Sequence, residues 1–173
     1  MVLDIHLSGA ERFFDSDALI VSKTDLKGRI LYSNRLFADL AGYEEAELIG
    51  APHSIIRHPH MPRAVFRLLW ERIIGGREIF AYVINRSRNG DHYWVFAHVT
   101  PSRDLDGTIT GFHSSRRAPR REAIDKIVPL YRHLLDIEGG QSDRKVGLHA
   151  SFAALQGILA RDQVGYDEFI FSF

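Results

Sequence analysis

Segments with two different hydrophobic periods follow one another along the chain and predict strands and helices in a definite order. A regular two-residue period runs from residue 92 to residue 100 and indicates a β-strand with two distinct faces. Four more short segments, rich in β-branched and aromatic residues, also predict strands: residues 19–24, 29–33, 78–85 and 108–115. The Asn89-Gly90-Asp91 sequence between two of them is typical of a tight hairpin.

Between the second and third predicted strands the period becomes helical. A short helix capped by Ser33 or Asn34 should end at Gly42, and residues 43–50 predict a second short helix closed by glycine. A polar segment with several prolines, residues 51–62, comes next. Pro62 suits the first turn of a longer helix that stops at the glycine pair 75–76.

This order predicts an α+β fold, because strands and helices are segregated instead of alternating as βαβ units. The simplest arrangement is a five-stranded antiparallel sheet with the helices covering one face. A cavity between the helices and the sheet would be the natural place for a ligand. We expect this domain to extend over residues 18–117.

The remaining residues, 118–173, predict a helical extension. An apolar stripe from Pro119 to about Glu138 indicates one helix, which Pro129 should kink. A glycine-rich linker at residues 139–143 leads to a second helical pattern from Lys145 to about Arg161. Four aromatic residues lie within residues 166–173, and they should either cover the sheet or form a surface for another protein.

The first 17 residues predict a short extension in which Phe13 and Phe14 pack a turn or helix onto the domain. The first residues, Met1 to His6, lack the charged and apolar regions of a signal peptide. No apolar run approaches the ~20 residues of a membrane span. We therefore expect a cytoplasmic protein with no membrane span.

The amino-acid composition excludes several classes of binding and catalytic site. The 173 residues include 22 Lys+Arg and 22 Asp+Glu, so the formal net charge is zero and no general nucleic-acid binding is expected. Cysteine is absent, which excludes disulfides, thiolate metal sites and iron–sulfur clusters. No residue set supplies a nucleophile, a base and an orienting group, so we do not expect an enzyme.

Several motifs resemble those of PAS domains: Asn34 at the first helix, Gly42-Tyr43, and the hairpin sequence Asn89-Gly90-Asp91-His92-Tyr93-Trp94-Val95. The stretch Pro52-His53-Ser54-Ile55-Ile56-Arg57-His58-Pro59-His60-Met61-Pro62, followed by Phe66 and Trp70, is similar in particular to the PAS domain of bacterial aerotaxis receptors. The resemblance covers about residues 19–117. It implies a PAS fold, a bound flavin, with FAD favoured over FMN, and sensing of redox state or oxygen.

The resemblance also implies site residues. Positions that the aerotaxis family is thought to need for FAD correspond to Asn34, Arg57, His58, Phe66 and Asn85. His60 and Trp70 complete the candidate set. Aromatic rings would stack on the flavin, Asn amides would meet its pyrimidine edge, and Arg57 or protonated His58 would meet phosphates or the anionic reduced flavin. Two positions depart from the family: His60 replaces an Asp, and Ile79 replaces a Trp.

Other interpretations of the same residues stay open. A histidine of the 53–60 segment could bind haem iron as an axial ligand, or the cavity could hold no cofactor. His58 and His60 together supply only two ligands, which is too few to indicate a metal site. Asn34 could simply cap a helix, and the aromatic residues could simply be core.

A domain of this kind must pass its signal on by contact. The partner would be a signalling protein or a second copy of the chain, and the C-terminal helices and aromatics are the predicted surface. The first hypothesis is therefore a flavin-bound sensor. The second is a cofactor-free interaction module built on the same fold.

Overall fold

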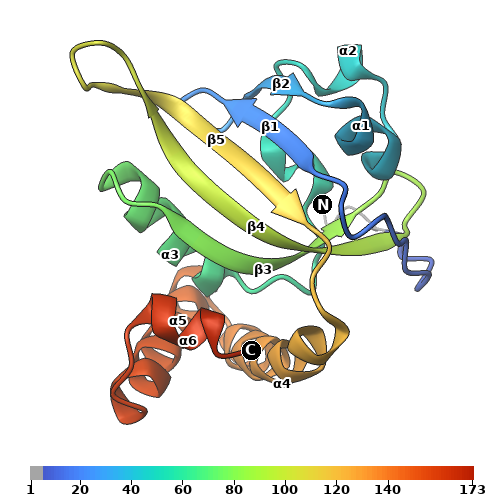
Figure 1. Cartoon of the computed structure of the whole chain (residues 1–173). Coiled ribbons are helices and arrows are strands. Elements are labelled where there is room, and N and C mark those ends of the chain that lie inside the picture. The colour runs from blue at the N-terminus through green and yellow to red at the C-terminus, as the bar shows by residue number, and fades with distance from the viewer. Residues whose placement is uncertain (1–5) are drawn as a thin grey trace.

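A computed structural model describes residues 6–173, and its centre is one five-stranded antiparallel sheet (Figure 1). The strands are β1 (Ile20–Thr24), β2 (Ile30–Ser33), β3 (Ile79–Arg86), β4 (His92–Arg103) and β5 (Ile109–Arg117). They lie in the order β2-β1-β5-β4-β3, so the first hairpin joins the last strand in the middle of the sheet. The predicted α+β class and sheet are confirmed.

The segment between β2 and β3 covers one face of the sheet. It contains α1 (Arg35–Ala41), α2 (Glu45–Leu48), the 3₁₀ helix η1 (His53–Ile56) and α3 (Arg63–Ile74). Asn34 caps α1, because its side chain accepts a hydrogen bond from the Phe37 amide at 3.2 Å. The helix ends at Gly42, whose φ of 73° places it in the left-handed region that glycine adopts without strain.

The strands present two different faces, as the alternation in residues 92–100 predicts. Ser22, Ala97 and Ser114 point toward the helical cover, and they line the space beneath it. On the opposite face, aromatic side chains from β3 and β4 pack together, and the Phe80 and His98 rings stack with centroids 4.1 Å apart. One face of the sheet is therefore built for a cavity and the other for aromatic packing.

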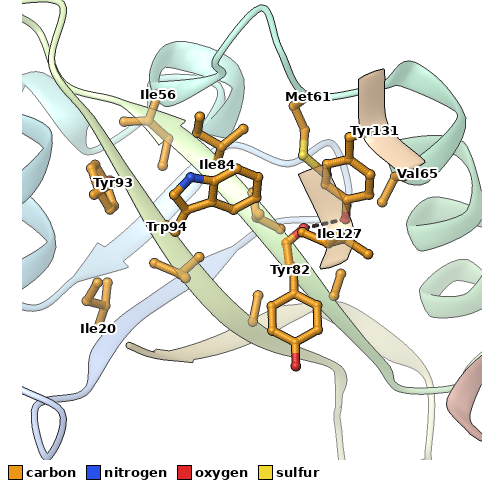
Figure 2. Close-up of a cluster of buried hydrophobic side chains, with 14 of the residues drawn as sticks. Ile20, Ile56, Met61, Val65, Tyr82, Ile84, Tyr93, Trp94, Ile127 and Tyr131 are labelled. Atoms are coloured by element: carbon orange, nitrogen blue, oxygen red, sulfur yellow. Dashed lines mark hydrogen bonds between the residues drawn. The ribbon is translucent and has the colours of Figure 1, made fainter. Parts of the chain in front are cut away.

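Three C-terminal helices, α4 (Arg121–Gly139), α5 (Arg144–Arg161) and α6 (Tyr166–Phe171), pack beside β3 and α3 (Figure 1). The Tyr131 hydroxyl of α4 donates to the Tyr82 carbonyl, and the Tyr131 ring stacks near Trp94 (Figure 2). In α6, Phe171 packs on Phe80 with ring centroids 4.8 Å apart. The C-terminal aromatics therefore fold back onto the sheet, one of the two predicted outcomes.

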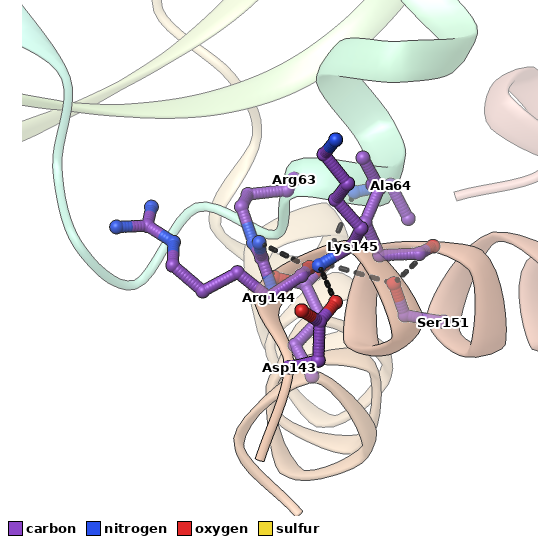
Figure 3. A network of polar contacts seen from close by, with 8 residues as sticks. Arg63, Ala64, Asp143, Arg144, Lys145 and Ser151 are labelled. Carbon is purple, nitrogen blue, oxygen red and sulfur yellow. Dashed lines mark hydrogen bonds and ion pairs between the residues drawn. The ribbon is translucent and has the colours of Figure 1, made fainter. Parts of the chain in front are cut away.

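A buried carboxylate joins α3, α4 and α5. Glu138, only 8% exposed, accepts hydrogen bonds from Arg63 Nε at 2.9 Å, the Ala64 amide at 3.1 Å and Ser151 Oγ at 2.9 Å. Figure 3 shows this network at the start of α5, where the Asp143 side chain also caps the helix. Because α3 forms part of the cavity cover, this network ties the cover to the C-terminal helices.

The structure corrects several element boundaries. β5 continues to Arg117 and β4 to Arg103, beyond their predicted ends, because the two strands pair with each other to those residues. α4 begins at Arg121 and continues through Pro129. Residues 6–17 of the N-terminal extension run alongside β4 and contain no helix, and Glu11 forms a bridge with His92.

The two N-terminal phenylalanines behave differently from each other. Phe14 packs against the core, as predicted, whereas Phe13 is 76% exposed. The expectation about a signal peptide rests partly on residues 1–5, which lie outside the described residues.

Candidate functional site

A cavity of about 320 Å³ lies between the sheet and the helical cover. Its floor is formed by β1, β3, β4 and β5, and its cover by the β1–β2 turn, η1 and α3. It is lined by Ser22, Thr24, Lys27, Gly28, Pro52, His53, Ser54, Ile56, Arg57, Phe66, Leu69, Trp70, Ile73, Val83, Asn85, Ala97, Val99, Phe112, Ser114 and Arg116. This is the space that the predicted architecture requires, and its volume lies at the lower end of the ~300–1,000 Å³ range of ligand pockets.

The walls combine apolar rings with cations. Trp70 meets Phe112 edge-on, with ring centroids 5.5 Å apart, and the Arg57 guanidinium lies 4.4 Å from the centre of the Phe66 ring. The cations on the lining are Lys27, Arg57 and Arg116, and no Asp or Glu belongs to it. The cavity is therefore electropositive and favours a ligand that carries negative charge.

Arg116 lies on the sheet floor and is 4% exposed. Its Nη2 group donates to Ser22 Oγ and to His53 Nε2, each at 2.7 Å. Among residues 6–173 it forms no ion pair, and its buried Nη1 group has no hydrogen-bond partner. Ser114 Oγ, also on β5 and lining the cavity, is buried without a partner as well. Buried polar groups are normally paired, so two unpaired groups on one wall indicate a place for a ligand's polar atoms.

The protonation states of this pair follow from burial. Burial lowers the pKa of Arg116 to about 10, so the guanidinium keeps its charge at neutral pH. Burial, followed by the charge of Arg116, lowers the pKa of His53 to about 3. His53 is therefore neutral, and its Nε2 atom accepts the hydrogen bond from Arg116 with the proton on Nδ1.

Four of the seven residues proposed from the sequence line the cavity: Arg57, Phe66, Trp70 and Asn85. Asn85 is 4% exposed and is joined to Arg57 by a backbone bridge between β3 and the cover. Within the described residues its side-chain amide makes no hydrogen bond, which leaves it available to a ligand.

The other three lie outside the cavity lining. Asn34 uses its side chain for the backbone: it accepts from the Phe37 and Val21 amides and donates to the Leu19 carbonyl at 2.7 Å. This bonding satisfies the amide, so Asn34 holds α1 against β1, the structural role weighed for it as an alternative.

His58 and His60 also lie away from the lining. His58 is 3% exposed, and its Nδ1 atom accepts from the His60 amide at 3.1 Å. Burial, followed by the neighbouring His60 and His92, lowers the pKa of His58 to about 4, so it is uncharged at neutral pH. The His60 side chain is exposed. Ile79, at the family's tryptophan position, is fully buried and packs with three lining residues: Ile73, Val99 and Phe112.

Sequence reasoning missed the polar floor, which is formed by Ser22, His53, Ser114 and Arg116. His53 was proposed only within a histidine segment for haem. In the structure its Nε2 lone pair is occupied by Arg116, and the haem alternative finds no support. Across residues 6–173, no three His, Asp or Glu side chains gather in a way that could hold a metal ion.

Comparison with known proteins agrees with this geometry. The profile of the PAS fold matches residues 12–114, more than half of the chain. The chain belongs to the PAS family. It is 35% identical over 145 residues to the aerotaxis receptor of Escherichia coli strain K12, a match that covers 84% of this chain and 28% of that protein. This PAS chain spans less than a third of the length of the curated relatives that it matches.

Solved structures share the fold. One, described as "Flavin Analogue Sheds Light on Light-Oxygen-Voltage Domain Mechanism", superposes with a TM-score of 0.57 at 15% identity, over 66% of this chain and 86% of its own. The light-state structure of the LOV domain of the blue-light photoreceptor Aureochrome1 superposes with a TM-score of 0.54 at 21% identity, over 66% of this chain and 90% of its own. These structures share the fold, and the family match together with the aerotaxis receptor identifies a PAS-type sensor domain. Within the described range, no helix combines the length and apolar character needed to cross a membrane.

Proposed function

We propose that this PAS domain binds a flavin in the cavity beneath η1 and α3 and senses redox state or oxygen through it. One observation carries the proposal. The cavity has largely apolar walls and three cations, includes no carboxylate, and ends on buried donors without partners. A ligand that is flat, apolar on its faces, polar at one edge and negatively charged through phosphate satisfies all of these features.

The residues present fit such a ligand. Phe66 and Trp70 offer apolar ring surfaces, and Asn85, Ser114 and Arg116 offer hydrogen bonds at different points of the lining. A cavity of about 320 Å³ suits the ring, with the remainder of the molecule leaving past the exposed side chain of Lys27. We propose FAD over FMN because the resemblance to the aerotaxis receptors implies FAD. The aerotaxis receptor of Escherichia coli is 35% identical to this chain.

The chemistry would be divided between the cofactor and the protein. A bound flavin supplies reversible electron transfer, while the protein holds the ring and sets the charge around it. Cysteine is absent from this chain, so an adduct with a cysteine thiol is not available to it. Redox sensing is therefore favoured over adduct photochemistry, and we propose no catalytic role for the domain itself.

We propose that the domain transmits its signal by contact with another protein. The C-terminal helices are bound to the cavity cover through Glu138 and to the sheet through the Tyr166 hydroxyl, which donates to the Phe80 carbonyl at 2.8 Å. A change at the cover would therefore reach the surface of these helices. We propose a signalling protein or a second copy of the chain as the partner, and the mass of the oxidised and reduced protein in solution tests the second of these.

The cofactor is tested by extraction. Protein produced with riboflavin supplied should release a flavin when it is heated, and chromatography of the extract separates FAD from FMN. FMN alone would correct the choice of cofactor. An extract without flavin, from protein that also fails to bind FAD or FMN on titration, would remove the proposal.

A further inference from the structure

Among residues 6–173, the positive charge of Arg116 is buried without an opposite charge beside it. The groups near its charge in the described structure are neutral: Ser22, His53, the buried Tyr93 and the Phe37 ring, whose centre lies 5.3 Å from the guanidinium carbon. A buried charge without an opposite charge is destabilising. The fold itself gains little from Arg116, so its place on the floor points to a ligand.

The position of Arg116 decides which part of the ligand it meets. Phosphate groups are strongly hydrated, and their transfer into a closed site is costly. Arg116 is 4% exposed and lies among β-strand residues on the floor, whereas the exposed Lys27 lies at the solvent side of the lining. The phosphate would therefore remain near Lys27, and the ring would reach Arg116.

We propose that Arg116, with Ser114 beside it on β5, binds the electron-rich polar edge of the flavin ring and makes the cavity prefer the reduced, anionic ring over the oxidised, neutral ring. This inference rests on the proposed function above. Arg116 Nη1 donates to the ring edge and Ser114 Oγ supplies a second polar contact, so both unpaired groups gain partners. The charge favours whichever ring state carries the greater negative charge, which raises the midpoint potential of the bound flavin.

The test compares Arg116→Met, Arg116→Lys and the matched control Arg117→Met. Arg117 is the next residue on β5 and is exposed on the opposite face, so its replacement removes the same charge from outside the cavity. Riboflavin, FMN and FAD are titrated into each protein, because riboflavin has the ring but no phosphate. The midpoint potential of the bound flavin is then measured.

Arg116→Met should weaken all three ligands to a similar extent, by at least tenfold. It should also reduce the preference for the reduced ring about tenfold, which lowers a two-electron midpoint potential by about 30 mV. Arg116→Lys keeps the positive charge, so the midpoint potential of its bound flavin should stay close to that of the wild type. Arg117→Met should match the wild type in both binding and midpoint potential. Loss of FMN and FAD binding with riboflavin unaffected would assign Arg116 to the phosphate and overturn the proposal, as would an unchanged potential in Arg116→Met.

A measurement without ligand separates this role from a structural one. The thermal midpoint of the ligand-free Arg116→Met protein should equal or exceed that of the wild type, because an unpaired buried charge has been removed. His53 keeps a hydrogen-bond partner, since the Ser22 hydroxyl lies 3.3 Å from its Nε2 atom. A clear fall would show that Arg116 serves the fold and would contradict the proposal. If the wild type binds none of the three ligands, the flavin function fails as well, whereas flavin binding that is indifferent to Arg116 removes this inference alone.

Discussion

Arg116 Nη2 on β5 lies 2.7 Å from Nε2 of His53 in η1, and this hydrogen bond joins the floor of the cavity to its cover. His53 can accept the bond only as a neutral ring, and burial together with the Arg116 charge keeps its pKa at about 3. A cation in the sheet and a neutral acceptor in the cover thus meet at the edge of the cavity, and the acceptor keeps one Arg116 donor satisfied.

Replacing His53 tests this link between floor and cover. In His53→Leu the Nη2 donor loses one of its two acceptors, and the free energy of unfolding should fall by about 1–3 kcal/mol. His53→Gln keeps an acceptor in the side chain and should lose less. Urea unfolding of the ligand-free proteins measures both, and equal losses for Leu and Gln would show that the hydrogen bond contributes nothing.

Acid should destabilise the domain through two histidines whose pKa values are lowered in the folded state. The folded-state pKa is about 3 for His53 and about 4 for His58, below the ~6.5 of an unfolded chain. Between these values the unfolded state binds more protons, so stability is full above about pH 6.5 and falls as the pH is lowered toward 4. Each histidine contributes at most about 1.4 kcal/mol per pH unit.

The variant His58→Asn isolates one of these contributions. Stability measured by urea unfolding from pH 7 to pH 4 should decline less steeply in His58→Asn than in the wild type. The exposed His149 offers the control, and His149→Asn should keep the wild-type slope. A His58→Asn slope equal to that of the wild type would contradict the assignment.

Glu138 is expected to be the most sensitive carboxylate of the helical extension. Glu138→Ala leaves Arg63, whose side chain is 22% exposed, without its ion-pair partner and should lower the free energy of unfolding by about 2–3 kcal/mol. Glu138→Gln retains acceptor oxygen for the Ala64 amide and should lose less. Asp136→Ala, an exposed position two residues earlier in α4, should change stability little. Similar urea midpoints for Glu138→Ala and Asp136→Ala would exclude a bracing role for Glu138.

Gly111 permits the close approach of β5 to the end of β1. A Cβ atom at this position would meet the Thr24 carbonyl oxygen at 2.2 Å, so Gly111→Ala must push the strands apart. We expect a loss of about 1–3 kcal/mol in thermal or urea unfolding. Gly139→Ala, where an added Cβ meets nothing within 4 Å, is the control and should be neutral or slightly stabilising. A neutral Gly111→Ala would show that the strands separate freely.

The sequence predicted the sheet and its cover well, because local physics determines them. The two-residue period in residues 92–100 identified both faces of β4, and Asn34 and Gly42 marked the ends of α1 through capping and a positive φ. The segment containing Arg57 and the positions of Phe66, Trp70 and Asn85 came from the family resemblance, and the structure places all four at the cavity.

The polar floor could not be predicted in the same way. The strand containing Arg116 was expected to end at Ser115, because the Ser-Ser-Arg-Arg sequence that closes β5 has no hydrophobic period. Arg is rarely buried, so its burial became visible only through pairing with β1 and β4. Conversely, the family resemblance and the histidine-rich segment predicted His58 and His60 as site residues, but neither lines the cavity.

The central claim is that this cavity holds a flavin ring, and a cavity-filling variant tests it directly. Ala97 is 3% exposed on the cavity floor, so Ala97→Leu places a larger side chain where the ring would lie. Ser115→Leu adds comparable bulk on the other face of β5 and serves as the control.

The decisive measurement is the visible absorption spectrum of the three proteins after saturation with FAD and removal of free cofactor. The account predicts flavin absorption that remains with the wild type and with Ser115→Leu, and a colourless but folded Ala97→Leu. A colourless wild type, or equal flavin retention by Ala97→Leu, would contradict it.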